Sequence, residues 1–219
     1  MDEPVELLRQ TLGDLAALLE SLTEPESWEP TGCAGWSVLD LGFHLLEDAH
    51  RALVDRATPA DGPPDTDAVG YWRPGRPSPH DGDDLWSARV AASVQGGIAR
   101  VARRHREAAA AVVVAAGRLG MQDAVRSQGA VMTVADDLSS MVVEAAIHHL
   151  DLVVRLDRPG PSAEPLAEVR RILAGLLGGP LPSRWDDVTA ARRGTGREPL
   201  TAEDRAELGP RAAAFPLFG

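Results

Sequence analysis

Glu144 and His148 are residue types that bind metal ions, and their spacing would bring them together. On a helix, residues four apart lie one above the other on the same face. Carboxylate and imidazole groups both bind zinc, and the spacing is similar to that of the two histidines of zinc-protease helices. One helix face would therefore offer two ligands to one metal ion.

A second explanation of the same pair is a hydrogen bond between Glu144 and His148 in a polar seam between helices. A Glu-x-x-x-His pattern is short, and short motifs often match by chance. From this pattern alone, a hydrogen bond between Glu144 and His148 is favoured over a metal site. The rest of the sequence has to decide between the two interpretations.

Both residues lie in a segment, 133–157, that predicts one long helix. Thr133 is a suitable N-cap, and Asp136 three residues later completes a pair that resembles a capping box. Most of the helix circumference is apolar, with Leu138, Val142, Ala146, Ile147, Leu150, Val153 and Val154. Such a helix is buried, and a carboxylate inside it needs a partner because an unpaired buried charge is very costly.

A third candidate ligand, His44, lies in another predicted helix, 37–56. Ser37 is suited to cap this helix, with Asp40 at its third position, and His44 lies beside the apolar stripe. Cys33 precedes the helix. Because nothing near it in the sequence would activate a thiol, Cys33 is interpreted as a small loop or buried residue.

The helical period extends over four segments, 4–22, 37–56, 84–116 and 133–157. They predict an all-α fold with an antiparallel four-helix core, in which inward-facing side chains of neighbouring helices build metal sites. The apolar stripe of the third segment contains Trp86, Val90, Val94, Ile98, Val101, His105, Ala108, Val112 and Ala115. His105 is interpreted as a buried core histidine, and Gly96-Gly97 as a kink or a close helix contact.

The remaining segments are expected to be shorter or irregular. Shorter helices are expected at 163–177 and 201–208, and an extended piece near 129–132. Residues 57–82 are rich in Pro, Gly and Asp, and an irregular loop of this length is uncommon in a compact domain unless it has a use. We expect this loop, through Tyr71 and Trp72, and the tail, through Trp185, to border a cleft above the metal.

The bulk composition excludes several classes of function. The net charge is −11, which argues against binding to nucleic acid or anionic membranes. The single cysteine allows no internal disulfide and favours a reducing compartment. The first residues do not resemble a signal peptide, and no apolar run approaches the ~20 residues of a membrane span. The expectation is a cytoplasmic monomer or homodimer. All 22 basic residues are arginine, which suggests a high-GC bacterial gene.

Two motifs together resemble a known family. Residues 35–45, GWSVLDLGFHL, match G-W-[ST]-x-x-D-L-x-x-H-L, and Glu144, His148 and Asp151 match E-x-x-x-H followed by a nearby Asp. The chain thereby resembles the DinB-like superfamily and, more narrowly, the mycothiol-dependent maleylpyruvate isomerase family. The resemblance covers roughly residues 4–157. It implies a DinB-like four-helix bundle over 1–160, followed by a small helical extension and irregular tail over 161–219.

The resemblance also implies a metal site and a reaction. Matched residue by residue, His44, Glu144 and His148 would bind one zinc ion, which leaves a fourth position open as in catalytic zinc sites. In the family, the thiol mycothiol takes that position as co-substrate, and its sulfur attacks an electrophilic small molecule. Addition alone gives S-conjugation, whereas addition, bond rotation and elimination give cis–trans isomerisation.

Further residues receive roles on this basis. Asp151 is a candidate catalytic residue that orients a ligand histidine, and the alternative for it is a surface ion pair with Arg155. Tyr71, Trp72 and Arg155 are candidates for binding the co-substrate. Two other functions stay open: a zinc-hydroxide hydrolase that uses no thiol, and a non-catalytic zinc or ligand-binding protein.

Overall fold

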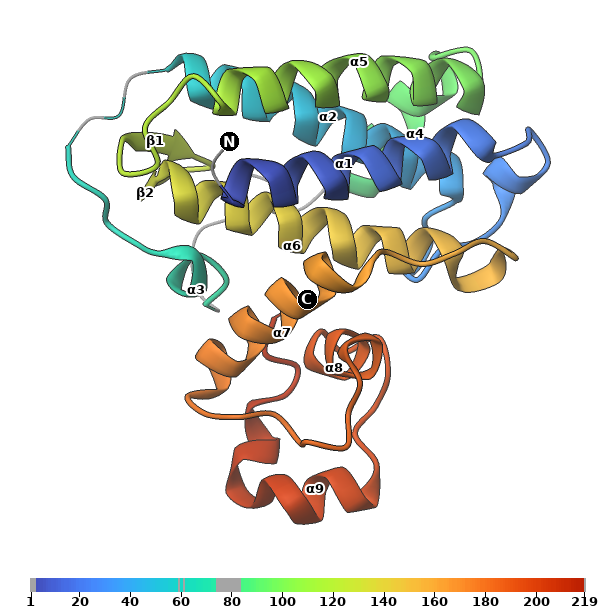
Figure 1. The fold of residues 1–219 in the computed structure, drawn as a ribbon. Helices are drawn as coiled ribbons and strands as arrows, with labels where there is room; N and C mark the ends of the chain where they lie inside the picture. Colours follow the sequence, from blue (N-terminus) through green and yellow to red (C-terminus); the bar gives the residue numbers. More distant parts are fainter. Residues whose placement is uncertain (1–2, 59, 61, 74–83, 219) are drawn as a thin grey trace.

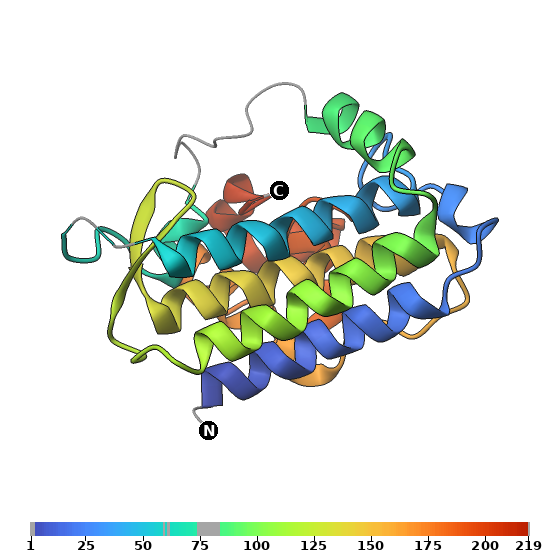
Figure 2. The same ribbon diagram turned by 90° about the horizontal axis from the view of Figure 1, so that it is seen from above.

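A computed structural model describes residues 3–58, 60, 62–73 and 84–218. Four long helices pack side by side around one apolar core (Figures 1 and 2). They are α1 (Glu3–Ser21), α2 (Val38–Ala57), α5 (Ile98–Ala116) and α6 (Val134–Leu152). The described chain is mostly helical, which confirms the all-α prediction.

The predicted caps form. The side chain of Ser37 accepts a hydrogen bond from the backbone N–H of Asp40, and the Asp40 carboxylate accepts one from Ser37 N–H. Thr133 accepts from Asp136 N–H in the same way. These caps fix where α2 and α6 begin and therefore which of their residues face each other. The α-helical part of α6 ends at Leu152, and one 3₁₀ turn, Val153–Arg155, follows.

The single helix expected over 84–116 is wrong. The chain forms α4 (Asp84–Ser93) and α5, separated by a turn in which Gly96 and Gly97 have φ of 86° and 89°. Glycine adopts such angles without steric cost, and they end a helix. Three apolar residues of the predicted stripe therefore lie outside the core: Trp86 is 67% exposed, Val90 48% and Val94 77%.

A short hairpin precedes α6. Its second strand contains the extended piece expected near residues 129–132, and its first strand pairs with it. Strand β1 (Ala124–Ser127) pairs antiparallel with β2 (Ala130–Thr133). The turn residues Gln128 and Gly129 both have positive φ, as a two-residue hairpin turn requires. The hairpin delivers the chain directly to Thr133, the cap of α6.

The described part of the expected loop 57–82 contains one helical turn, α3 (Ala68–Tyr71), capped by Asp67. The backbone N–H of Ala68 donates to the Asp136 carboxylate at 3.1 Å, which fixes α3 to the start of α6. Residues 74–82 of the expected loop lie outside the described residues.

Helix α6 lies between two apolar cores, which explains its apolar circumference. One side, with Leu138 and Val142, packs in the core of the four long helices. The other side, with Ile147 and Leu150, packs against the C-terminal helices. The sequence-based prediction of a buried helix is thereby confirmed.

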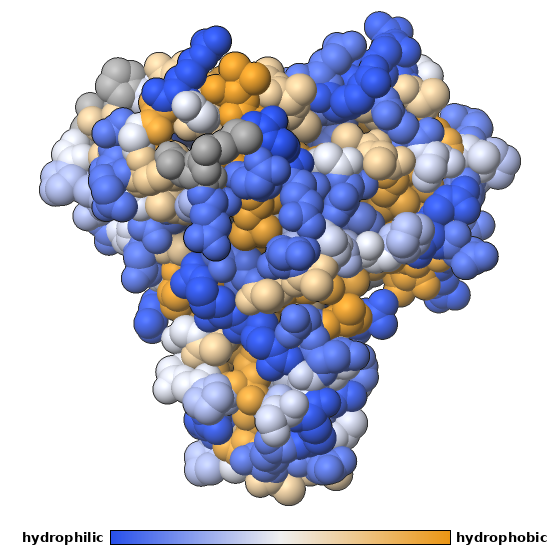
Figure 3. All heavy atoms as spheres, in the orientation of Figure 1, coloured by the Kyte–Doolittle hydropathy of each residue, from blue (hydrophilic) through white to orange (hydrophobic). Residues whose placement is uncertain are grey.

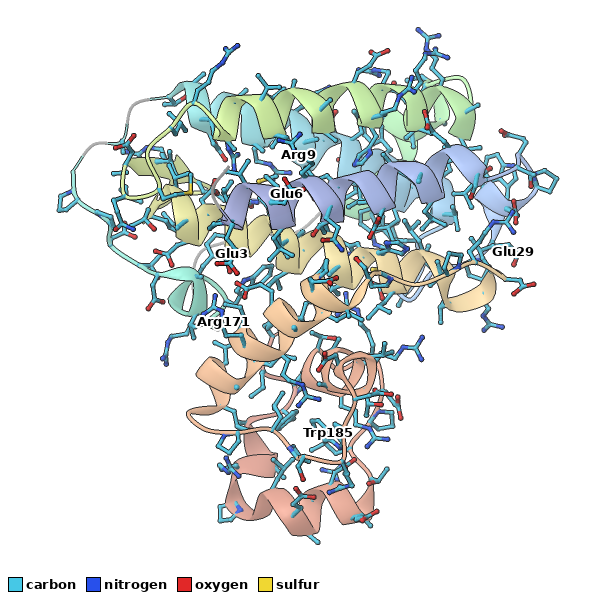
Figure 4. The ribbon with its side chains drawn as sticks, in the orientation of Figure 1. Glu3, Glu6, Arg9, Glu29, Arg171 and Trp185 are labelled. Atoms are coloured by element: carbon cyan, nitrogen blue, oxygen red, sulfur yellow. The ribbon has the colours of Figure 1, made fainter. Side chains whose placement is uncertain are left out.

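The C-terminal segment forms a second helical unit below α6 (Figure 1). It contains α7 (Ala163–Leu177) and α9 (Ala202–Leu208), both expected, and α8 (Asp187–Gly194), which the irregular-tail prediction missed. Trp185, expected beside the cleft, is instead 4% exposed and packs inside this unit (Figure 4). The division of the chain at residue 160 stays a prediction.

The face shown in Figure 3 is mainly hydrophilic, with apolar side chains in small separate groups. None of the described helices is long and apolar enough to cross a membrane.

The C-terminal unit is held together by Asp204. Its carboxylate is fully buried and accepts hydrogen bonds from Trp185 Nε1 at 2.7 Å and Arg193 Nη1 at 2.8 Å, and it also pairs with Arg184. We expect Asp204→Ala to destabilise the protein by about 3 kcal/mol, because it leaves the buried Trp185 N–H without its acceptor and removes the capping box of α9. Urea unfolding followed by tryptophan fluorescence measures this.

Glu203→Ala is the matched control, since the Glu203 side chain is 79% exposed. It should change the free energy of unfolding by less than about 0.5 kcal/mol. Equal effects of the two substitutions would contradict the role of Asp204.

Candidate metal centre

His44, Glu144 and His148 lie together, as the sequence predicts. Their ligand atoms lie within 4.8 Å of one another. Glu144 Oε1 lies 3.0 Å from His148 Nε2 and 3.6 Å from His44 Nε2. The two histidine rings meet edge to face with centroids 5.2 Å apart. Helix α2 supplies one group and α6 the other two, with the predicted four-residue spacing.

The charges of this cluster are strongly coupled. Burial alone would raise the pKa of Glu144, but His148 and His44 hold it well below its usual range. Burial alone would lower the pKa of His148, but the Glu144 charge and hydrogen bonds to Asp151 and Cys33 raise it well above its usual value. The surroundings of Glu144 thus favour positive charge between the helices.

Asp151 orients His148. Its Oδ2 lies 3.1 Å from His148 Nδ1, on the opposite side of the ring from Glu144. Arg197, in the chain between α8 and α9, donates to both Asp151 oxygens at 2.8 Å. Although burial alone would raise the pKa of Asp151, the hydrogen bonds of His148 and Arg197 lower it to about 2. The expected alternative, an ion pair between Asp151 and Arg155, is wrong because Arg197 occupies the carboxylate.

Cys33 is closer to the site than its sequence context indicates. Its thiol donates to Asp151 Oδ2 at 3.3 Å, and its sulfur lies 3.8 Å from His148 Nδ1. Cys33, His148 and Asp151 therefore form a second group of potential ligands. This group suits a cation less well, because the Arg197 guanidinium already neutralises Asp151.

The loop that carries Cys33 approaches α6 closely. The N–H of Gly32 donates to the Asp151 carbonyl at 2.9 Å. A Cβ atom at Gly32 would lie 2.3 Å from Asp151 Oδ1. Only glycine fits at this position without moving the carboxylate.

Asp48 and His149 are the other titratable neighbours. Asp48 Oδ2 lies 3.1 Å from His44 Nε2, is shielded from solvent and has no partner with hydrogen-bond geometry among the described residues. The other oxygen, Oδ1, pairs with Arg51 at 2.5 Å. Burial raises the pKa of Asp48, the Glu144 charge adds to the rise, and His44 opposes it. The ring of His149 contacts the Pro159 carbonyl at 3.1 Å, in a hydrogen bond outside this cluster.

The cluster opens into a cavity of about 770 Å³. Tyr71 and Trp72, two of the predicted binding residues, line it, and Trp72 stacks on Phe218 from the end of the chain with centroids 4.5 Å apart. The third, Arg155, is exposed on the 3₁₀ turn after α6 and does not line the cavity. The prediction that Arg155 lies in the site is therefore wrong. Helix α6 ends at Leu152, so Arg155 does not continue the row of Glu144, His148 and Asp151.

Sequence reasoning assigned no role to several groups of the site. Trp36 packs edge to face on His44, with ring centroids 5.6 Å apart, and lines the cavity. Its place in the Gly-Trp-Ser motif, eight residues before His44, is the signal that could have found it. Arg197 has no such signal, because its contact with Asp151 spans 46 residues.

The comparison with protein families identifies the chain. Residues 8–153 match the model of the mycothiol maleylpyruvate isomerase N-terminal domain. The chain belongs to this family. The match covers both ligand-bearing helices and ends just after α6. No curated protein and no solved structure matches the chain significantly.

The donor set fits a divalent cation. Two imidazoles and one carboxylate are ligands that zinc accepts, and three protein ligands leave a position open. Asp48, whose Oδ1 pairs with Arg51 at 2.5 Å, presents its second oxygen, Oδ2, beside His44. A metal ion would supply the positive charge that the surroundings of Glu144 favour, and His44, Glu144 and His148 would hold it.

The ion pair of Arg197 with Asp151 gives a prediction. Arg197→Gln should weaken the affinity for Zn²⁺ about 10- to 100-fold, the usual effect of losing a group that orients a ligand. Competition with a chelator of known affinity measures it. Arg205→Gln is the control, because Arg205 is exposed on α9, and it should leave the affinity unchanged. Equal affinities of both variants would contradict the orienting role.

His105 gives a prediction about acid stability. Its side chain is 1% exposed, and burial lowers its pKa to about 4. Because the folded-state pKa is lower than the unfolded value of about 6.5, the unfolded state binds the proton first as pH falls. Between pH 7 and pH 4 the wild type should therefore lose about 3 kcal/mol more stability than His105→Leu.

Urea unfolding of the two proteins at pH 7 and pH 4 tests this. His50→Leu is the control, since the side chain of His50 is 39% exposed. If the free energy of unfolding falls equally in the wild type and in His105→Leu between pH 7 and pH 4, His105 does not cause the acid destabilisation.

Proposed function

We propose that the protein is a zinc- and thiol-dependent enzyme on a DinB-like four-helix bundle, with mycothiol as co-substrate. His44, Glu144 and His148 bind one zinc ion, and the reaction is S-conjugation or cis–trans isomerisation of an electrophilic small molecule. The convergence of these three ligand atoms at a cavity carries the proposal. The family membership supports the choice of thiol.

A zinc ion with an open coordination position would bind the thiol and keep its sulfur as a thiolate, which is the nucleophilic form. The residues of the chain provide the geometry. Asp151, held by Arg197, fixes the ring of His148. Trp36 restricts the ring of His44 by edge-to-face packing. Both imidazoles are therefore oriented before any ligand binds, which reduces the cost of organising the site.

The walls of the cavity combine polar and apolar surface. Tyr71 at the end of α3, Trp72 directly after it and Phe218 near the end of the chain lie over it. Apolar cover beside the reacting atoms excludes water, which strengthens the electrostatic interactions inside the site. The C-terminal segment thus takes part in the site through both Phe218 and Arg197.

A non-catalytic zinc protein is the alternative that one observation favours. A closed zinc site needs a fourth protein ligand. The Nε2 of His149 contacts the Pro159 carbonyl. Asp48 Oδ2, in contrast, lies close to His44 and has no hydrogen-bond partner in the described part of the chain. If Asp48 completes the coordination, the site is structural.

The first test is substitution of a proposed ligand. His148→Ala should abolish zinc retention and thiol transfer, because two of the three ligands do not hold zinc against dialysis. The protein should stay folded, since the apolar faces of α6 are unchanged. His50→Ala, an exposed histidine on α2, should retain one zinc ion per chain. Metal analysis after dialysis, with mycothiol and a panel of electrophiles followed by mass spectrometry, gives both readouts.

Asp48→Asn separates the proposal from its alternative in the same assay. In an open catalytic site the substitution leaves one zinc ion per chain and thiol transfer in place. In a closed structural site it removes a ligand, and zinc retention falls as in His148→Ala. A wild-type protein that retains no zinc would overturn both readings.

The cavity wall gives a further prediction. Trp72→Ala should raise the KM for the thiol or the electrophile about 10-fold, because loss of a partly buried aromatic side chain removes contact area on the ligand. Trp28→Ala is the control, since Trp28 is 63% exposed and does not line the cavity. Unchanged KM values for both reactants would remove Trp72 from the binding site.

A further inference from the structure

Tyr71 is the single tyrosine of the chain, and no described residue forms a hydrogen bond with its hydroxyl group. Its side chain is half-buried and lines the cavity of the candidate metal centre. The hydroxyl oxygen is not one of the unpartnered polar atoms that are fully shielded from solvent, so a ligand can reach it. A phenylalanine would complete the same apolar wall. The hydroxyl therefore adds a donor that the described part of the fold does not use.

The position of Tyr71 is fixed by the packing of α3. The first residue of this helix is hydrogen-bonded to α6. On its other side α3 packs closely on α7, where a Cβ atom on Gly175 would lie 2.8 Å from a methyl group of Val69. The Tyr71 ring meets the Trp72 ring edge to face, with centroids 5.2 Å apart. The hydroxyl group is therefore held in place before a ligand binds, as an effective hydrogen-bond donor in catalysis requires.

The charges around the cavity keep the Tyr71 hydroxyl protonated. Burial raises the pKa of Tyr71, and the negative charge of Glu144 raises it further. Asp137 and Asp48 act in the same direction, and Arg51 opposes them. The phenol is thus within electrostatic reach of a proposed metal ligand, Glu144. It is a neutral donor near pH 7.

Two arginines in the cavity wall are already engaged by carboxylates. Arg51 pairs with Asp48, and Arg197 pairs with Asp151. Negative charge that develops on a substrate in this cavity would also lie near the carboxylates of the wall, which disfavour it. A neutral, uncommitted donor such as the Tyr71 hydroxyl stabilises such charge without breaking an existing ion pair.

We propose that Tyr71 is a catalytic residue: its hydroxyl group donates a hydrogen bond to the carbonyl oxygen of an α,β-unsaturated electrophile during addition of the thiol. This inference rests on the proposed function. The thiolate sulfur forms a bond to the β-carbon, and the electron pair of the double bond moves toward the carbonyl oxygen, which becomes an enolate oxygen. Tyr71 keeps its proton and stabilises this negative charge.

The enolate can react further in two ways. In isomerisation, the bond between the α- and β-carbons rotates, the thiolate is expelled and the carbonyl group is restored. In S-conjugation, the α-carbon takes a proton from solvent, which replaces the proton that the thiol released. The hydrogen bond from Tyr71 serves both outcomes, because both pass through the same enolate.

Two electrophiles test this role with mycothiol and the zinc-loaded full chain. Dimethyl maleate reacts by addition and develops charge on a carbonyl oxygen, whereas benzyl chloride has no carbonyl group and reacts by displacement of chloride. Tyr71→Phe should lower the ratio of kcat for dimethyl maleate to kcat for benzyl chloride about 100-fold, the usual effect of removing one donor to a developing oxyanion. The KM for dimethyl maleate should change little, because the ground-state carbonyl accepts a weaker hydrogen bond.

Two neighbouring donors provide matched controls. Trp72→Phe removes an indole N–H that has no partner among the described residues, and Arg73→Gln removes an exposed cation from the cavity lining. Both variants should leave the ratio of the two kcat values unchanged. Tyr71→Phe should also unfold at the wild-type temperature, since the lost hydroxyl has no protein partner in the described residues. An unchanged ratio in Tyr71→Phe, or an equal fall in either control, would overturn the proposal.

A binding measurement tests the contact without turnover. Dimethyl succinate is the saturated analogue of dimethyl maleate, and a carbonyl group that accepts a hydrogen bond has a lower stretching frequency. Infrared difference spectra should show a lower carbonyl frequency for dimethyl succinate bound to the wild type than to Tyr71→Phe, and equal frequencies would contradict the contact. Failure of the proposed function would appear differently, as no thiol transfer to either electrophile. Thiol transfer to both with an unchanged ratio would refute the role of Tyr71 alone.

Discussion

Helix α6 carries three carboxylates at seven-residue spacing, Asp137, Glu144 and Asp151, along a side that is largely buried. Seven residues are nearly two helical turns, so the three groups lie in one row. An unpaired charge there would be very costly, and each carboxylate has a cationic partner. Asp137 pairs with Arg56 of α2 at 2.6 Å, Glu144 with two histidines, and Asp151 with Arg197. The neighbouring segments are positioned by these pairs as well as by apolar packing.

The three pairs differ in one respect that bears on function. Arginines neutralise Asp137 and Asp151 permanently, because guanidinium groups do not lose their proton in proteins. Glu144 is balanced only by imidazoles, whose proton can be exchanged for a metal ion. The row therefore contains two fixed ion pairs and one exchangeable position between them. This arrangement would confine a cation to the middle of α6, where the cavity is.

Local signals were readable from the sequence, whereas long-range contacts were not. The caps at Ser37 and Thr133 and the Glu144–His148 spacing depend on residues within one or two turns, and each forms as predicted. The apolar residues repeat with the helical period on both sides of Gly96-Gly97 and therefore predicted one helix. The period does not reveal that the two glycines have positive φ, which ends the helix there. The N-cap of α8 was present as Asp186 and was overlooked.

The contacts around Asp151 show why a motif alone underdetermines a site. The sequence indicated that Asp151 is near His148, but its partners come from the loop before α2 and from the C-terminal unit. Arg197 can reach Asp151 only when α8 is folded against α7, since it follows α8 directly. The orientation of His148 thus depends on a segment that lies outside the family match. A bundle without this segment would keep all three ligands but would lose the guanidinium that holds Asp151 ionised against His148. The C-terminal unit therefore stabilises the arrangement of the candidate metal centre, although it supplies none of the three proposed ligands.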